Sequence, residues 1–209
     1  MREVRIAVLV SGGGTNLQAL IDAQKKGVIH SGKISLVISN KEGAYALTRA
    51  ERAGIPSATV TRAGEGSQEA FEAKLISILE EYRIDMIVLA GFLSILSADF
   101  TSRYPERILN VHPSLIPAFC GKGFYGLYVH EAALAKGVKV SGATVHIVTP
   151  ECDAGPIVLQ KAVEVKDDDT PETLQKRIMI EAEWKILPEA VKLFCQDRIV
   201  VEGNRARIL

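Results

Sequence analysis

Short apolar runs alternate with segments of helical periodicity along the first half of the sequence, and this alternation constrains the fold more than any other feature. A run such as VRIAVLV at residues 4–10 is typical of a strand that is buried on both faces, as strands in parallel sheets are. Strands that alternate with helices are joined by right-handed crossovers. The predicted strands of this kind are residues 4–10, 34–39, 57–61, 86–90 and 108–111.

The segments between these strands have the periodicity of helices. Thr15 is predicted to cap the first helix, in which Leu17, Leu20 and Ile21 recur at helical spacing. Further helices are predicted at residues 44–53 and 68–82. These helices are long enough to cover both faces of a sheet.

The pattern changes after residue 111. Residues 138–148 and 157–165 have the alternation of longer strands separated by a turn, and we expect them to be antiparallel additions at one side of the sheet. A final long helix is predicted to begin with Thr170 at its cap and Pro171 at its first position. Pro188 should kink this helix or split it in two.

The elements together predict an α/β fold: a mostly parallel Rossmann-like sheet with helices on both faces and antiparallel strands added in the C-terminal part. A small hairpin at residues 199–201 and 205–208, around Gly203-Asn204, is predicted to close the chain. The sequence shows no repeat, linker or low-complexity segment, so all 209 residues are expected to form a single domain.

Composition excludes several classes of function. The 25 basic and 25 acidic residues balance, which argues against a nucleic-acid binder. There is no run of about 18 apolar residues and no signal-peptide pattern, so no membrane partner is expected. The three cysteines, Cys120, Cys152 and Cys195, are odd in number and far apart, which fits a reducing cytoplasm. We expect a cytoplasmic monomer or homodimer that acts on small molecules.

The sequence SGGGTN at residues 11–16 lies between the first strand and the first helix. Glycines allow close approach of the backbone to a ligand, and a helix N-terminus offers free N–H groups that favour phosphate. The spacing is neither GxGxxG nor a Walker A loop, so a single phosphate monoester suits it better than a dinucleotide. The alternative is a glycine-rich turn that binds no ligand.

The stretch LNVHPSLIP at residues 109–117 places His112 at the carboxyl end of a predicted strand, the edge where parallel sheets bind ligands. Asn110 lies two positions earlier and therefore faces the same side. An amide and an imidazole at one spot could stabilise an oxyanion, and Asp153, in a turn between strands, is the best candidate to keep His112 protonated. The alternative is a structural histidine.

The other histidines give weaker signals. His130 is expected to open the helix VHEAALAK, and alternation places His146 at the same edge as Thr144. Neither forms a short-spaced ligand pair with another histidine or with Cys120 or Cys152, so no metal site is predicted.

Several stretches resemble the folate-dependent formyltransferase superfamily and, within it, the phosphoribosylglycinamide formyltransferases. They occur in the family's order over nearly the whole chain. They are SGGGTNLQALI at 11–21, VISN at 37–40, VLAGFLSIL at 88–96, LNVHPSLIP at 109–117, GATVHIVTPECDAGPIVLQ at 142–160, and the spacing of Glu183 and Pro188.

The resemblance implies transfer of a formyl group from 10-formyltetrahydrofolate to the amine of 5-phosphoribosylglycinamide, with no metal. It implies an N-terminal half that binds the ribonucleotide and a C-terminal half that binds folate and carries catalysis. Asn110, His112 and Asp153 match the family's catalytic residues. The substrate-binding matches are Gly12, Gly13, Gly14, Thr15, Asn16 and Glu183, and the folate-binding matches are Gln68, Leu93, Ser94, Ile95, Leu96 and Asn110.

The chain departs from the family on the donor side. Gln68 and Ser94 stand where many members have arginines, which reduces the positive charge available to the folate tail. Residues 119–130 are expected to form a mobile loop, with Lys122 toward the donor's carboxylates. Two other functions stay open at this point: a formyltetrahydrofolate hydrolase, and a non-enzymatic sensor of nucleotide phosphate.

Overall fold

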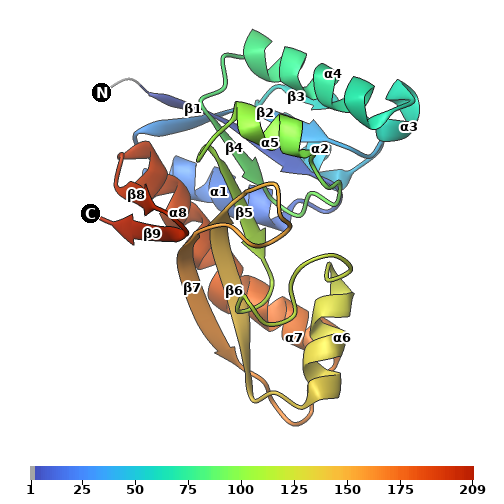
Figure 1. The fold of residues 1–209 in the computed structure, drawn as a ribbon, viewed down its shortest axis with the longest axis vertical. Helices are drawn as coiled ribbons and strands as arrows, with labels where there is room; N and C mark the ends of the chain where they lie inside the picture. Colours follow the sequence, from blue (N-terminus) through green and yellow to red (C-terminus); the bar gives the residue numbers. More distant parts are fainter. Residues whose placement is uncertain (1–2) are drawn as a thin grey trace.

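The computed structural model describes residues 3–209 and contains a seven-stranded sheet covered by helices on both faces (Figure 1). The strand order is β3-β2-β1-β4-β5-β6-β7; β1 to β5 pair in parallel, and β6 and β7 follow β5 as antiparallel strands. This confirms the predicted fold class. The strands are β1 (Val4–Val10), β2 (Gly32–Ser39), β3 (Ser57–Thr59), β4 (Met86–Leu89), β5 (Ile108–His112), β6 (Val140–Ile147) and β7 (Ile157–Glu164).

The helices form two layers, with α4 and α5 on one side of the sheet and α1, α7 and α8 on the other (Figure 1). A π-helical turn, η1 (Met179–Glu183), joins α7 to α8, and a separate hairpin of β8 (Ile199–Glu202) and β9 (Arg205–Ile208) confirms the predicted terminal hairpin. The helices are α1 (Thr15–Lys25), α2 (Tyr45–Arg52), α3 (Arg62–Glu65), α4 (Gln68–Glu81), α5 (Ala98–Arg103), α6 (Leu127–Lys136), α7 (Pro171–Ile178) and α8 (Trp184–Cys195).

Successive residues of β1 serve opposite layers, which is why this strand is apolar throughout its buried part. Ile6 and Val8 belong to the core cluster that contains Leu20 of α1, whereas Ala7 belongs to the cluster that contains Phe71 of α4. All five side chains are fully buried. Because side chains alternate across a strand, a strand between two helical layers needs apolar residues at odd and even positions alike.

The strand order places a topological switch point between β1 and β4. The chain passes from β1 outward to β2 and β3, and then returns to place β4 on the other side of β1. The connections that leave β1 and β4 therefore diverge and open a crevice at their carboxyl ends, the usual place of a ligand in such sheets.

Two local predictions are wrong. Thr15 does not cap α1: the capping position belongs to Gly14, whose φ of 70° suits glycine, and no side chain caps this helix. Pro188 does not split the final helix at its own position but lies inside α8; the interruption comes earlier, at η1. A π-helical turn is wider than an α-turn, so it breaks the regular helix before the proline is reached.

Helices α3 and α5 were not predicted because they are only four and six residues long, too short to show an apolar period. Their capping residues were the available signal. Thr61 accepts a hydrogen bond from the Gly64 N–H, and Ser97 accepts one from the Phe100 N–H. Within residues 3–209, no helix is long and apolar enough to cross a membrane.

We expect Phe71→Ala to lower the free energy of unfolding by about 3–5 kcal/mol, because it removes a fully buried ring and leaves a cavity beneath α4. Urea denaturation measures the difference. Lys74 is exposed on the same helix, so Lys74→Ala, the control, should change stability by less than about 0.5 kcal/mol. Equal effects of the two substitutions would contradict the conclusion that the buried Phe71 ring stabilises the packing of α4 on the sheet.

Candidate active site

A cavity of about 850 Å³ opens at the carboxyl ends of β1, β4 and β5. The loop after β1, the loop after β4, the end of β5, and the turn between β6 and β7 all line it. Every predicted site residue except Gln68 lies in its wall. The sheet thus brings together residues that are up to about 170 positions apart in the sequence, as the switch-point argument requires.

Asn110, His112 and Asp153 converge at one end of this cavity. Asp153 Oδ2 lies 3.6 Å from His112 Nδ1, and Asp153 Oδ1 lies 3.5 Å from the Asn110 amide nitrogen. The Gly121 N–H donates to Asp153 Oδ2 at 2.9 Å. Asp153 has a φ of 54°, which its short polar side chain tolerates. A Cβ on Gly155 would lie 1.9 Å from the Ile147 carbonyl oxygen, so only glycine lets this turn pack against β6.

His146 is a fourth member of this cluster, and its place in the sequence predicted no contact with Asn110 or Asp153. It lies opposite Asn110 across the β5–β6 pair. Its Nε2 is 3.0 Å from Asn110 Nδ2 and 3.5 Å from Asp153 Oδ1, and its Nδ1 is 3.0 Å from the Ile147 carbonyl oxygen. That carbonyl can only accept, so Nδ1 donates to it, and Nε2 lies within reach of both the Asn110 amide and the Asp153 carboxylate. His146 therefore orients the Asn110 amide. The sequence pattern did not reveal this contact because it depends on the antiparallel register that places His146 opposite Asn110.

Charge at this end of the cavity follows from two opposing effects. Burial alone would raise the pKa of Asp153, but contacts with His146, His112 and the Gly121 N–H lower it to about 2, so this carboxyl is ionised at neutral pH. Burial also lowers the pKa of His112 below its usual value, and the charge of Asp153 and the contact with Phe119 offset this only in part. The permanent charge of the cluster is therefore negative and resides on Asp153.

The second ring nitrogen of His112 faces the main chain. Its Nε2 lies 2.9 Å from the carbonyl oxygen of Phe119, a residue held at a φ of 50°. Buried hydrogen bonds shape the segment between the two residues. The Ser114 hydroxyl donates to the Ala118 carbonyl at 2.6 Å, and the Thr144 hydroxyl donates to the Ser114 carbonyl at 2.7 Å. Both nitrogens of His112 thus face oxygen acceptors.

The glycine loop occupies the other end of the cavity, at the N-terminus of α1. Asn16 lies in the first turn and donates to Glu183 Oε2 at 2.6 Å. Its own Oδ1 is buried without a hydrogen-bond partner, which is costly unless a ligand supplies a donor. Burial raises the pKa of Glu183 to about 7, against the lowering effect of its bond to Asn16.

The folded protein holds the Glu183 proton up to about pH 7, whereas the unfolded chain releases it near pH 4.5. This group therefore stabilises the fold below pH 4.5, and that contribution is lost as the pH rises through 7. We expect the stability of Glu183→Gln relative to the original protein to increase as the pH rises from about 5 to about 8, by up to about 3 kcal/mol in total. Denaturation at several pH values measures this gain, and exposed Glu181→Gln should show none. A pH-independent difference would contradict the burial argument.

The loop after β4 lines the cavity with apolar side chains that remain accessible: Leu93 is 49% exposed and Ile95 is 61% exposed. The Ser94 hydroxyl accepts a hydrogen bond from the Asn40 amide at 2.7 Å. Gln68, predicted to contact folate, is turned aside: its amide donates to Glu72 Oε1 at 2.6 Å and to the Ile95 carbonyl. Lys122 lies in the cavity wall.

His130 does not open α6 but is its fourth residue, fully buried in the cavity wall with neither ring nitrogen hydrogen-bonded. Burial lowers its pKa to about 4, with a contribution from His112. Burial raises the pKa of the Cys152 thiol to about 11, which keeps it neutral. In the part of the chain that the structure describes, no group of three or more His, Cys, Asp and Glu residues is placed to hold a metal ion.

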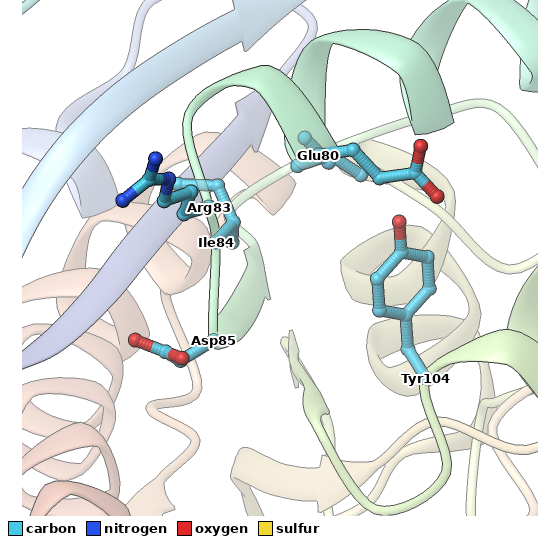
Figure 2. A pocket seen from close by; sticks show the side chains of 6 residues that line it. Glu80, Arg83, Ile84, Asp85 and Tyr104 are labelled. Atoms are coloured by element: carbon cyan, nitrogen blue, oxygen red, sulfur yellow. The ribbon is translucent and has the colours of Figure 1, made fainter.

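A smaller hollow of about 260 Å³ lies at the opposite edge of the sheet, before the start of β4. Figure 2 shows the Tyr104 phenol facing the Glu80 carboxylate, with Arg83 and Asp85 on the other wall. Burial raises the pKa of Tyr104, with a smaller contribution from Glu80. None of the predicted site residues lines this hollow, so the larger cavity is the candidate active site.

Residues 4–191 match the family described as formyl transferase, and the chain belongs to this family. It is 40% identical over 203 residues to phosphoribosylglycinamide formyltransferase of Escherichia coli (strain K12), a match that covers 97% of this chain and 92% of that protein. The crystal structure of glycinamide ribonucleotide transformylase 1 from Symbiobacterium toebii superposes with a TM-score of 0.93 at 46% identity, over 99% of this chain and 94% of that one.

Larger proteins contain a similar segment. The trifunctional purine biosynthetic protein adenosine-3 of Gallus gallus is 44% identical over 206 residues, which are 99% of this chain. The chain spans about a fifth of the length of that protein, since the match covers 20% of it.

Proposed function

We propose that this protein transfers the formyl group of 10-formyltetrahydrofolate to the amine of 5-phosphoribosylglycinamide, a step of de novo purine biosynthesis. Family membership and the names of relatives that match nearly the whole chain support this assignment. The observation that carries it is the convergence in one cavity of Asn110, His112 and Asp153 with the glycine loop at the N-terminus of α1.

The two ends of the cavity suit the two substrates. At one end, the free N–H groups of α1 would receive the phosphate of the acceptor, and Glu183 and Asn16 would meet its ribose hydroxyls. The unpartnered Oδ1 of Asn16 is an acceptor for such a hydroxyl. At the other end, exposed Leu93 and Ile95 offer an apolar wall to the flat ring of the donor.

In the proposed reaction, the amine attacks the formyl carbon and a tetrahedral intermediate forms with negative charge on the formyl oxygen. The Asn110 amide and His112 stabilise this oxygen. Because the Phe119 carbonyl engages His112 Nε2, Nδ1 is the nitrogen that can meet the formyl oxygen. Its distance of 3.6 Å from Asp153 is longer than a hydrogen bond, so Nδ1 can readily exchange this contact for one with the formyl oxygen.

Protonation of His112 follows from the same geometry. Burial favours the neutral ring in the free protein, whereas Asp153 and the Phe119 carbonyl favour the charged ring. The oxyanion adds negative charge beside the ring, so the cation is most stable when the intermediate forms. Collapse breaks the bond from the formyl carbon to the folate nitrogen. One proton passes from the attacking amine to that nitrogen, and we assign Asp153 to the relay.

We expect His112→Ala to lower kcat by on the order of 10²–10³, because it removes an oxyanion donor, while affinity for the ribonucleotide is retained. Asp153→Asn should lower kcat by a similar factor. Asp168→Asn is the matched control because Asp168 is exposed and does not line the cavity. Initial rates of tetrahydrofolate release report turnover. Near-normal rates for Asp153→Asn would refute the role assigned to Asp153.

A product assay separates transfer from hydrolysis. We expect tetrahydrofolate and formylated ribonucleotide to appear in equal amounts when both substrates are present, and little tetrahydrofolate to appear without the acceptor. Release of formate at the same rate with and without the acceptor would identify a hydrolase instead. Binding of the ribonucleotide without turnover of any formyl donor would identify a sensor.

A further inference from the structure

Helix α2 lies behind the glycine loop and contacts each of its three glycines. The Ala46 N–H, at the start of α2, donates to the Gly12 carbonyl at 3.0 Å. Arg49 Nε donates to the Gly13 carbonyl at 2.8 Å. A Cβ on Gly14 would lie 2.6 Å from the Ala46 Cβ, so the third glycine packs directly on the helix. The loop is therefore supported from outside the cavity by α2.

These contacts set the direction of the loop's N–H groups. In a planar trans peptide, the C=O of one residue and the N–H of the next point in opposite directions. Because the carbonyls of Gly12 and Gly13 are held toward α2, the N–H groups of Gly13 and Gly14 point away from it. Both glycines line the cavity, so the contacts made by Ala46 and Arg49 orient two backbone donors toward its interior.

The guanidinium of Arg49 is fixed at this position by further contacts. Its Nη1 donates to Gln18 Oε1 of α1 at 3.0 Å, and its central carbon lies 5.0 Å from the centre of the Tyr45 ring. Among the residues that the structure describes, no carboxylate forms an ion pair with Arg49. A positive charge thus lies directly behind the loop, where it favours an anion in front of it.

We propose that Arg49 is a positioning residue for the phosphate monoester of the acceptor: it fixes the Gly13 peptide and supplies a charge behind it without reaching the ligand itself. This role rests on the proposed function, because that function places a phosphate at this loop. It adds a residue that the sequence pattern of the loop does not include, since Arg49 belongs to the next helix along the chain.

Arg52 offers a matched control on the same helix. Its guanidinium lies 5.9 Å from the centre of the same Tyr45 ring, and its Nη1 donates to the Tyr45 hydroxyl at 3.1 Å. It is exposed and bonds to Tyr45 rather than to the loop. Arg52→Gln therefore removes an equal charge from the same face without altering the support of the Gly13 peptide.

The test compares Arg49→Gln, Arg49→Lys and Arg52→Gln with the original protein. Calorimetry measures the affinity for ribose 5-phosphate, which carries the phosphate but no amine, and for ribose. Steady-state assays measure KM for the ribonucleotide, KM for the formyl donor, and kcat. We expect Arg49→Gln to weaken ribose 5-phosphate binding by about tenfold and to raise the ribonucleotide KM in parallel. The donor KM and kcat should stay within about twofold.

The two other variants separate charge from geometry. Arg49→Lys retains the charge but loses the paired contacts to the Gly13 carbonyl and Gln18, so it should recover only part of the affinity. Arg52→Gln should bind ribose 5-phosphate like the original protein. Equal weakening by Arg49→Gln and Arg52→Gln would overturn the proposal, and so would unchanged binding in Arg49→Gln.

The proposed function can fail independently of this inference. If the original protein binds ribose 5-phosphate but transfers no formyl group, the function is wrong, and the calorimetric comparison of Arg49 and Arg52 still decides the role of Arg49. If Arg49→Gln loses kcat and affinity for both substrates together, the residue supports the fold as a whole and the specific role is wrong.

Discussion

The ionised carboxylate of Asp153 is the group on which the arrangement of the candidate active site depends. It lies on the turn between the two antiparallel strands, and it contacts an imidazole from β5, an imidazole from β6 and a backbone N–H from the loop that follows β5. An uncompensated buried charge is expensive, so these partners are needed to keep the turn in place. The same charge favours the protonated form of His112. One group therefore both holds the turn in place and sets the charge beside His112.

Two acids in this cavity have opposite environments. Asp153 is surrounded by donors and stays ionised, whereas Glu183 has the single Asn16 amide and is pushed toward its neutral form. Asp153 is half-buried and meets several donors, whereas Glu183 is buried and meets one. The result is a negative charge beside His112 and, next to Asn16, an acid that is about half protonated at neutral pH. An anion placed at the glycine loop would therefore not face a full negative charge on Glu183.

The sequence predicted most of the fold because its strongest patterns reflect burial. The strands beginning at Val4 and Met86 are apolar on both faces, and only a sheet between two helical layers accommodates that pattern. The start of α1 was predicted less well. A threonine after three glycines looks like a cap, but the capping residue is Gly14, which has a left-handed conformation and lets α2 approach. Hydrogen bonds between distant residues leave no periodic trace, which is why the contacts of His146 and Arg49 were found only in the structure.

The π-helical turn at Met179–Glu183 has a consequence for the contact between Glu183 and Asn16 in the cavity wall. A wide turn of this kind contains one more residue than an α-turn, and each residue of a regular helix advances by about 100° around the axis. Loss of a single residue from it would leave α7 and α8 as good helices with their own hydrogen bonds intact. It would also close the widened backbone that carries Glu183, while α7 and α8 keep nearly the same relative orientation. The width of a helical joint therefore governs the contact between Glu183 and Asn16, independently of the chemistry of the two side chains.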